Sequence, residues 1–206
     1  MQVAVVKYNA GNIFSVMNAL RRLGVEPLLT DHADELREAD RVIFPGQGEA
    51  SNAMAYLHEH GLDEVIRSLR QPVLGICIGQ QLLCRHSEEG DVDCLGIFDA
   101  EVKRFCPTRH EDKVPCMGWG PLQLPLGGEA SPLFHGLFPS SPQGGLPYVY
   151  FVHSYYVPLC HETIATADYI LPYSAALHKD NFYATQFHPE KSGSVGERII
   201  KNFLEL

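Results

Sequence analysis

The first half of the chain alternates short apolar runs with longer segments in which apolar residues recur at helical spacing. The run at 3–6 is apolar throughout, as expected of a strand buried on both faces of a parallel sheet. After a turn at 8–12, apolar residues recur at helical spacing up to Leu23, and Gly24 predicts the end of that helix. Further apolar runs predict strands at 25–30, 41–44 and 72–76, with helices after the last two.

Alternating strands and helices are typical of an α/β fold. We expect a flavodoxin-like, open and mostly parallel sheet flanked by helices, because strand–helix–strand units have right-handed crossovers that cover the sheet. Such sheets bind ligands at the carboxyl ends of their strands. Two glycine-rich turns, at 45–48 and 75–79, follow predicted strands and therefore lie at that edge.

The second half is less regular and predicts additional strands with antiparallel pairs. These strands are expected at 148–152, 163–167, 174–177 and 182–187. Prolines and paired glycines indicate a loop or insertion over 121–147 rather than a second domain. A last helix runs through 195–204, and Ser194 with Glu197 resembles a capping box at its start. We therefore expect a single domain over 1–206.

Charge and composition narrow the class of protein. The formal net charge is −9, and the sequence has no basic stripe of the kind that binds nucleic acid. The N-terminus lacks the features of a signal peptide, and no apolar run approaches the ~20 residues that span a bilayer. We expect a cytoplasmic protein that binds neither nucleic acid nor membrane.

The six cysteines form no metal-binding pattern. They include no C-x-x-C pair, and no histidines lie at zinc-finger spacing, so neither a metal nor a cofactor is expected. In a reducing compartment they should be free thiols, and a cysteine of this kind is usually a small buried hydrophobic residue. Only Cys77 has a sequence context that suggests more.

Cys77 is the centre of a G-x-C-x-G sequence between a predicted strand and a predicted helix. This is the thiol version of the G-x-S-x-G nucleophile elbow. Gly75 and Gly79 would remove side chains that collide in so sharp a turn. The start of a helix favours thiolate, and the N–H of Ile78 would point at a reacting carbonyl group. The alternative is a strand–turn–helix with a buried cysteine.

A cysteine nucleophile needs a base, and His188 has the most suggestive context of the ten histidines. It follows a predicted strand and stands in His188-Pro189-Glu190. Pro189 restricts the backbone, so that the Glu190 carboxylate can reach the imidazole and fix its tautomer. Taken alone this could be a surface turn, but with a cysteine elbow on the same sheet it predicts a Cys–His–Glu triad.

The glycine-rich turn at 45–48 completes the set of motifs. It can expose backbone N–H groups to an oxyanion, and it lacks the spacing of a phosphate loop. The turn at 45–48, the C-x-G-x-Q from Cys77 to Gln81 and the later H-P-E together resemble the class I, or triad, glutamine amidotransferases. Within this class the chain resembles the glutaminase subunits of imidazole glycerol phosphate synthases, through the Asn12 turn, P-x-M-G-W at 115–119 and Y-F-V-H-S-Y at 150–155.

The resemblance implies a role for each matching residue. Cys77 would attack the amide of glutamine, His188 would move protons, and Glu190 would orient His188, with oxyanion N–H groups from Gln47 and Ile78. The residues implied to hold glutamine are Gly46, Gln81, Glu89, Ser154 and Tyr155. The residues implied to face the partner are Asn12, Trp119, Tyr150 and Lys191. That partner is a cyclase subunit with a (β/α)8 barrel, which forms a heterodimer with the glutaminase and receives its ammonia.

Four positions depart from the family pattern. The family usually has Val at Gln47 and Met at Gln80. It commonly has His or Gln at Cys116 and often Asn at Gly120. Because the oxyanion donor at Gln47 is a backbone N–H, a side-chain change there need not remove it.

Three other functions remain open from the sequence. The same triad could supply a different synthase, although the Asn12 turn and Met117-Gly118-Trp119 argue against this. It could belong to a free-standing cysteine hydrolase, against which Gln81 argues. The chain could also be an inactive flavodoxin-like interaction module, which the intact Cys–His–Glu set disfavours.

Overall fold

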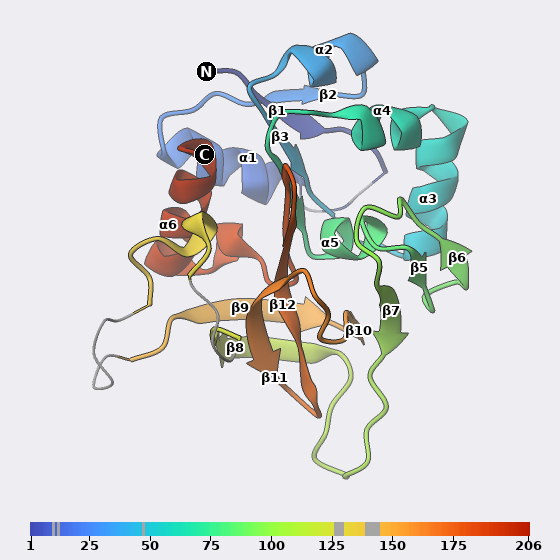
Figure 1. The fold of residues 1–206 in the computed structure, drawn as a ribbon, viewed down its shortest axis with the longest axis vertical. Coiled ribbons are helices and arrows are strands. Elements are labelled where there is room, and N and C mark those ends of the chain that lie inside the picture. Colours follow the sequence, from blue (N-terminus) through green and yellow to red (C-terminus); the bar gives the residue numbers. More distant parts are fainter. Residues whose placement is uncertain (10, 12, 47, 126–129, 139–144) are drawn as a thin grey trace.

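A seven-stranded, mostly parallel sheet runs through the centre of the molecule in a computed structural model (Figure 1). The structure describes residues 1–9, 11, 13–46, 48–125, 130–138 and 145–206. The strand order is β11-β12-β13-β4-β3-β1-β2, and the last five of these are parallel. β12 runs antiparallel to β13, and β11 antiparallel to β12. The strands are β1 (Val3–Val6), β2 (Leu28–Thr30), β3 (Arg41–Phe44), β4 (Val73–Ile76), β11 (Thr163–Asp168), β12 (Pro172–Lys179) and β13 (Phe182–Thr185).

Helices cover both faces of this sheet, because its parallel strands are apolar on both sides. Val3 and Val5 of β1 belong to one buried cluster, and Ala4 and Val6 to the other. The first cluster contains α1 (Ile13–Arg22) and α6 (Gly193–Leu204). The second contains α2 (Ala33–Glu38), α3 (Ala50–Glu59), α4 (Leu62–Ser68) and α5 (Ile78–Leu82). The predicted α/β class, with antiparallel strands in the C-terminal half, is confirmed.

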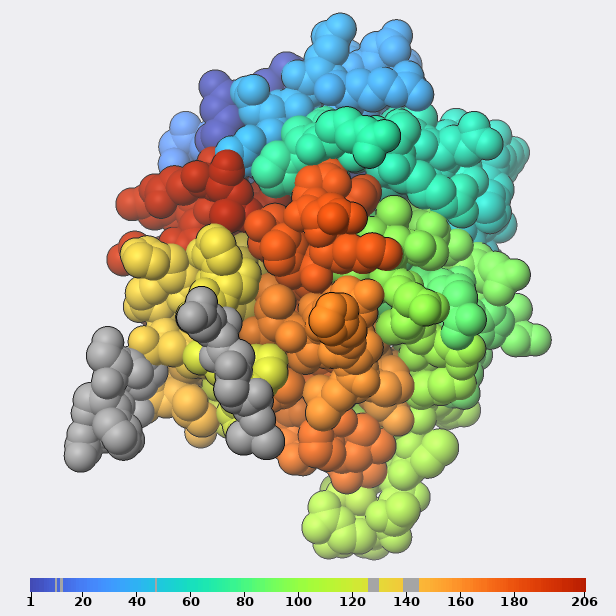
Figure 2. Space-filling view, viewed as in Figure 1, coloured from blue at the N-terminus to red at the C-terminus, as the bar shows by residue number. Residues whose placement is uncertain are grey.

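Two smaller sheets lie beyond the carboxyl ends of the parallel strands. One has the order β10-β7-β5-β6, and the other is the β8–β9 hairpin. Their strands are β5 (His86–Ser87), β6 (Val92–Asp93), β7 (Glu101–Arg104), β8 (Cys116–Pro121), β9 (Tyr148–His153) and β10 (Tyr155–Tyr156). The connection from β7 to β8 projects from the body as the yellow-green protrusion in Figure 2. Short 3₁₀ turns, η1 (Pro132–Phe134) and η2 (Pro189–Lys191), complete the chain.

Several local predictions differ from the structure. The strand expected at 25–30 covers only Leu28–Thr30, and the region expected to be a loop at 121–147 contains the end of β8 and the turn η1. The capping box is wrong, because α6 begins one residue earlier than Ser194 and its N-cap residue is Ser192, whose side chain makes no capping bond. Ser192 instead bonds to the segment that carries His188.

Candidate active site

Cys77 stands in a strained turn between β4 and α5. Its backbone angles are φ 55° and ψ −108°, a conformation that non-glycine residues rarely adopt and that persists only where the surroundings enforce it. Part of that enforcement comes from the neighbouring strand, since the Cys77 N–H donates to the carbonyl of Thr185 at 2.7 Å. The sheet thus fixes the position of Cys77 at the carboxyl end of β4.

The two glycines of the elbow are required by close packing, as predicted. A Cβ at Gly79 would overlap the backbone carbonyl oxygen of Phe44 in β3. A Cβ at Gly75 would lie 2.9 Å from the carbonyl oxygen of Gly79 and 2.7 Å from Leu83. Since backbone atoms cannot move aside as a side chain does, only glycine allows α5 to start this close to the sheet.

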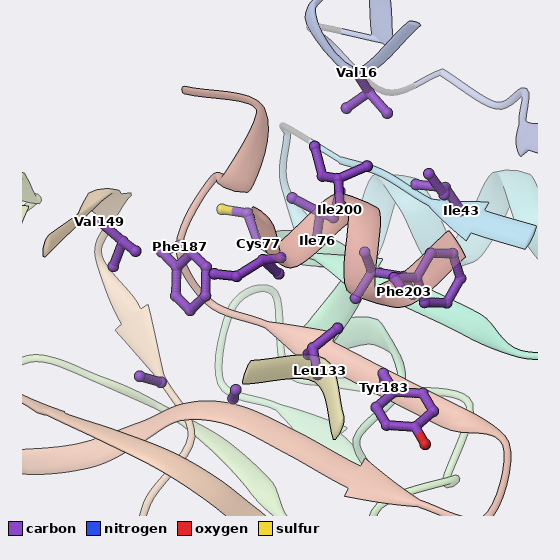
Figure 3. Close-up of a cluster of buried hydrophobic side chains, with 14 of the residues drawn as sticks. Val16, Ile43, Ile76, Cys77, Leu133, Val149, Tyr183, Phe187, Ile200 and Phe203 are labelled. Carbon is purple, nitrogen blue, oxygen red and sulfur yellow. The ribbon is translucent and has the colours of Figure 1, made fainter. Parts of the chain in front are cut away.

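Cys77 is only 7% exposed and belongs to a buried apolar cluster. Figure 3 shows its sulfur directed away from Ile76 and Ile200. The carbonyl oxygen of Val152 lies 3.9 Å from the sulfur, and the side-chain Nε2 of Gln186 lies 3.8 Å from it.

His188 and Glu190 follow β13, the strand beside β4, so the sheet brings them to Cys77. The Nδ1 atom of His188 lies 2.8 Å from Oε1 of Glu190, and both residues are buried. Burial opposes protonation of His188, but its interactions with Cys77 and Glu190 outweigh that effect and raise its pKa to about 9. Its Nε2 is buried and has no hydrogen-bond partner among the described residues. The imidazole is therefore held at one nitrogen and available at the other.

The backbone around His188 is bonded to β9. The His188 N–H donates to the carbonyl of Tyr150 at 2.9 Å. The Ser192 hydroxyl donates to the carbonyl of His188 at 2.7 Å and accepts the Tyr150 N–H at 3.0 Å. Tyr150 of β9 is thus hydrogen-bonded to the segment 188–192 through both its N–H and its carbonyl group.

None of the other five cysteines stands in such a turn: burial raises the pKa of four of them, and the fifth, Cys106, is exposed. All six cysteines are described, and all are free thiols, as expected. Burial raises the pKa of Cys94 to about 12 and that of Cys116 to about 11, and it also raises the pKa values of Cys84 and Cys160. The expectation of a buried thiol is wrong for Cys106, which is exposed after β7.

A cavity of about 370 Å³ opens beside Cys77, within the range of small-molecule sites. It contains six residues that the sequence singled out: Cys77, Ile78, Gln81, Glu89, Ser154 and Tyr155. Its other lining residues are Gly48, Pro115, Val152 and His153. Gly46 is not among them. It lies against the Ile78 side chain, where a Cβ would overlap that side chain. Gln47 lies outside the described residues.

Two polar residues of the site were not predicted. Gln186 is fully buried, and its Oε1 accepts a bond from Gln81 Nε2 at 3.0 Å. His153 is bonded through Nδ1 to the Tyr155 carbonyl at 2.7 Å, and burial lowers its pKa to about 4. The sequence did contain a signal for Gln186, because it lies near the end of the strand predicted at 182–187, two residues before His188.

Glu89 reaches the cavity from the loop after β5. Its carboxylate accepts the N–H of Ala50 at 3.0 Å, which ties this loop to the start of α3. Burial raises its pKa above the ordinary value. Glu89 is the acidic residue among the described residues that line the cavity, which also include Ser154 and Tyr155.

Three of the four residues predicted to face a partner lie on or beside the β8–β9 hairpin. Trp119 is 57% exposed and pairs across the hairpin with Tyr150, with ring centroids 6.1 Å apart. Met117 and Tyr148 are also exposed on these strands. Lys191 lies in η2, next to the histidine segment, and Asn12 lies outside the described residues.

Metal and membrane features are absent from the described part of the chain. None of its histidine, cysteine and acidic side chains form a group of three or more that could hold a metal ion. None of its helices is long and apolar enough to cross a membrane.

Comparison with known proteins identifies the class. The sequence model of the class I glutamine amidotransferases matches residues 4–206, and the chain belongs to that class. Imidazole glycerol phosphate synthase subunit HisH of Bacteroides thetaiotaomicron is 62% identical over 206 residues, covering 100% of both chains. The subunit of the same name from Pectobacterium atrosepticum is 43% identical over 207 residues, again covering 100% of both. Within the class, the chain belongs to the HisH family of imidazole glycerol phosphate synthase subunits.

Solved structures share the fold. A glutamine amidotransferase superposes with a TM-score of 0.71 at 22% identity, covering 98% of this chain and 97% of the other. PurLQS from Thermotoga maritima gives a TM-score of 0.70 at 17% identity, covering 99% of this chain and 97% of that chain. At these identities the likeness bears on the fold alone. The full-length HisH relatives favour this synthase over the other acceptors that the triad motif left open.

Proposed function

We propose that this chain hydrolyses glutamine to glutamate and ammonia with a Cys77–His188–Glu190 triad. The observation that carries the proposal is the position of the strained Cys77 at the edge of the cavity, beside the His188–Glu190 pair. Cys77 sulfur attacks the side-chain carbonyl carbon of glutamine and forms a thioester. His188 gives a proton to the departing nitrogen, which leaves as ammonia, and then takes one from the water that cleaves the thioester. Glu190 fixes the orientation of His188.

The oxyanion formed in each step needs hydrogen-bond donors. The backbone N–H groups of Ile78 and Gln47 are proposed to supply them, the second after a change in the peptide orientation of the turn at 45–48. Ile78 lines the cavity next to Cys77, in support of the first assignment. Gly46 allows this turn to pack directly on Ile78, as a larger residue could not.

The amino-acid part of glutamine is proposed to bind Gln81, Glu89 and the backbone of Ser154 and Tyr155. All four line the cavity. Glu89 offers a carboxylate to the α-ammonium group. The chemistry needs no cofactor, since the thiol, imidazole and backbone donors of the chain suffice.

The ammonia is proposed to pass to a cyclase subunit with a (β/α)8 barrel, in a cytoplasmic heterodimer. The relatives are subunits of imidazole glycerol phosphate synthase, and we propose that this ammonia is used to make imidazole glycerol phosphate and aminoimidazole carboxamide ribotide in histidine biosynthesis. Trp119, Tyr150, Lys191 and Asn12 would face the cyclase. We further propose that residues 1–206 form one domain, since both apolar clusters pack on the same central sheet.

A glutamine-mimicking electrophile tests this function. It should label Cys77, and excess glutamine should protect the thiol, because both compete for the same cavity. Peptide mapping by mass spectrometry locates the adduct. The exposed Cys106 is the natural internal control, since glutamine should not protect it. Glutamine-protected labelling of another cysteine, or labelling of Cys77 that glutamine does not reduce, would count against the proposal.

A further inference from the structure

Gln186 lies beside the nucleophile because of the register between two strands. Thr185, the last residue of β13, pairs with Ile76, the last residue of β4. The next residue along each strand is Gln186 on one side and Cys77 on the other. Gln186 is also pinned by its backbone, whose N–H donates to the carbonyl of Ala175 in β12 at 2.8 Å. Its fully buried side chain thus has little freedom of position.

A chain of hydrogen bonds fixes which end of the Gln186 amide faces Cys77. The chain begins at the carbonyl of Tyr155, which can only accept. Gln81 must therefore present its Nε2 to that carbonyl, and it does so at 3.0 Å. The same Nε2 lies 3.0 Å from the Gln186 side chain, so Gln186 must present its Oε1 there. The end of the Gln186 amide left for Cys77 is Nε2, a donor, at 3.8 Å from the sulfur.

We propose that Gln186 is a further functional residue of the site, whose side-chain N–H stabilises the Cys77 thiolate. A donor aimed at sulfur favours the charged form of the thiol over the neutral form. The bond is worth more here than in water, because Gln186 is buried and no competing solvent surrounds it. His188 supplies the proton transfer, whereas Gln186 has no titratable group and acts as a fixed donor.

The same chain of bonds also orients Gln81 for its ligand. Both Nε2 hydrogens of Gln81 are used, by Tyr155 and Gln186. The part of its amide left for the cavity is Oε1, an acceptor, which suits an α-ammonium group. This inference rests on the proposed glutaminase function. It connects the proposed nucleophile Cys77 to the proposed substrate-binding residue Gln81 through the buried side chain of Gln186.

Replacement of Gln186 by Met tests the inference, because Met has nearly the same length and no donor. The readout is the alkylation rate of Cys77 by iodoacetamide as a function of pH, in the full chain without glutamine or partner. For Gln186→Met we expect the rate at pH 7 to fall about tenfold and the pH of half-maximal rate to rise by about one unit. A purely structural role for Gln186 would not move the pH profile.

Gln80→Met is the matched control. Gln80 is equally buried and adjacent to the same elbow, but its side chain donates to the carbonyl of Ser174 in β12. Its Oε1 has no hydrogen-bond partner among the described residues, so Met should be tolerated. We expect Gln80→Met to keep the wild-type pH profile. If both variants behave alike, or if Gln186→Met keeps the wild-type profile, the inference is wrong.

A measurement on the wild-type chain covers the case in which Gln186→Met does not fold. With ¹⁵N-labelled glutamine side chains, the Gln186 amide resonances should shift with the same pH midpoint as Cys77 alkylation, and those of Gln80 should not. If the Gln186 resonances do not shift with the pH midpoint of Cys77 alkylation, the inference is wrong. Failure of a glutamine mimic to label wild-type Cys77 would instead overturn the proposed function, so the two failures are distinguishable.

Discussion

At the scale of single residues, two buried histidines near Cys77 have opposite protonation behaviour. His188 has Glu190 and Cys77 as neighbours, and its pKa rises to about 9. His153 has a carbonyl and the Tyr173 hydroxyl as partners, and burial with nearby His188 lowers its pKa to about 4. Groups whose pKa values are pushed apart in this way are typical of acid–base sites. His188 is therefore the residue suited to carry a proton, and His153 is suited to remain neutral.

The low pKa of His153 predicts a loss of stability in acid. In the unfolded chain this histidine takes up a proton near its ordinary pKa of 6.5, but in the folded chain only near 4. Its stabilising contribution is therefore complete above pH 6.5 and is lost as pH falls towards 4, by about 3 kcal/mol. His153→Asn keeps a donor for the Tyr155 carbonyl and removes the titration. Urea unfolding at several pH values should show that the free energy of unfolding falls less steeply below pH 6.5 in this variant than in the wild-type chain. An equally steep fall in both chains would contradict the low pKa of His153.

At the scale of elements, the contact between β9 and η2 connects the β8–β9 hairpin to the segment that carries His188. Tyr150 lies in the same strand as the cavity residue His153, and its N–H and carbonyl both bond to the segment 188–192. Ser192 contributes the only side chain among these bonds in the described part of the chain. A shift of β9 would therefore move His188 relative to Cys77.

Ser192→Ala should lower glutaminase kcat about tenfold, because the variant removes the acceptor of the Tyr150 N–H and leaves the His188 carbonyl with the Lys191 N–H alone. KM for glutamine should change less, since Ser192 does not line the cavity. Ser194→Ala is the matched control, because Ser194 is exposed two residues further along. Steady-state kinetics of both variants with the cyclase present measure the effect. Equal activity in the two would show that this contact does not position His188.

Many of the helices and strands could be predicted from the sequence, and the others depend on contacts between segments that are far apart in the sequence. Buried parallel strands such as β1 can be recognised in the sequence as short apolar runs. β8 contains two glycines and a proline and is defined by its pairing with β9, so its pattern alone did not indicate a strand. The roles proposed for Ser192 and Gln186 could not be predicted for a related reason: both depend on hydrogen-bond partners far away in the sequence, Tyr150 and Cys77.

At the scale of the whole molecule, the exposed apolar side chains of the β8–β9 hairpin are the clearest sign of a partner. Met117 and Trp119 are both more than half exposed, and Tyr148 is 52% exposed on the opposite strand. Exposed apolar patches of this kind mark interaction sites. The cavity and this patch share the strand β9, so the candidate active site and the exposed patch are close to each other in the fold.

The isolated chain should therefore be nearly idle, and the cyclase with its ligand should activate it. If the N–H of Gln47 points away from Cys77 at rest, one oxyanion donor is missing, which typically costs about 10²–10³ in rate. We expect kcat to rise about 10²-fold or more on adding cyclase and acceptor, with a smaller effect on glutamine affinity. Trp119→Ala should weaken the activation by weakening cyclase binding, while Gln47→Pro should abolish activation and leave binding intact. Full activity of the chain alone would rule out this switch.

The central claim is that Cys77 is the nucleophile that releases ammonia from glutamine, and one comparison tests it most directly. The Cys77→Ala chain, assembled with the cyclase, is supplied with either glutamine or ammonium, and formation of imidazole glycerol phosphate is measured. Glutamine-dependent synthesis should be lost, because no thioester can form, while ammonium-dependent synthesis should persist, because Cys77 faces the cavity rather than the exposed hairpin. Glutamine-dependent synthesis at a rate comparable to that of the wild-type complex would contradict the account.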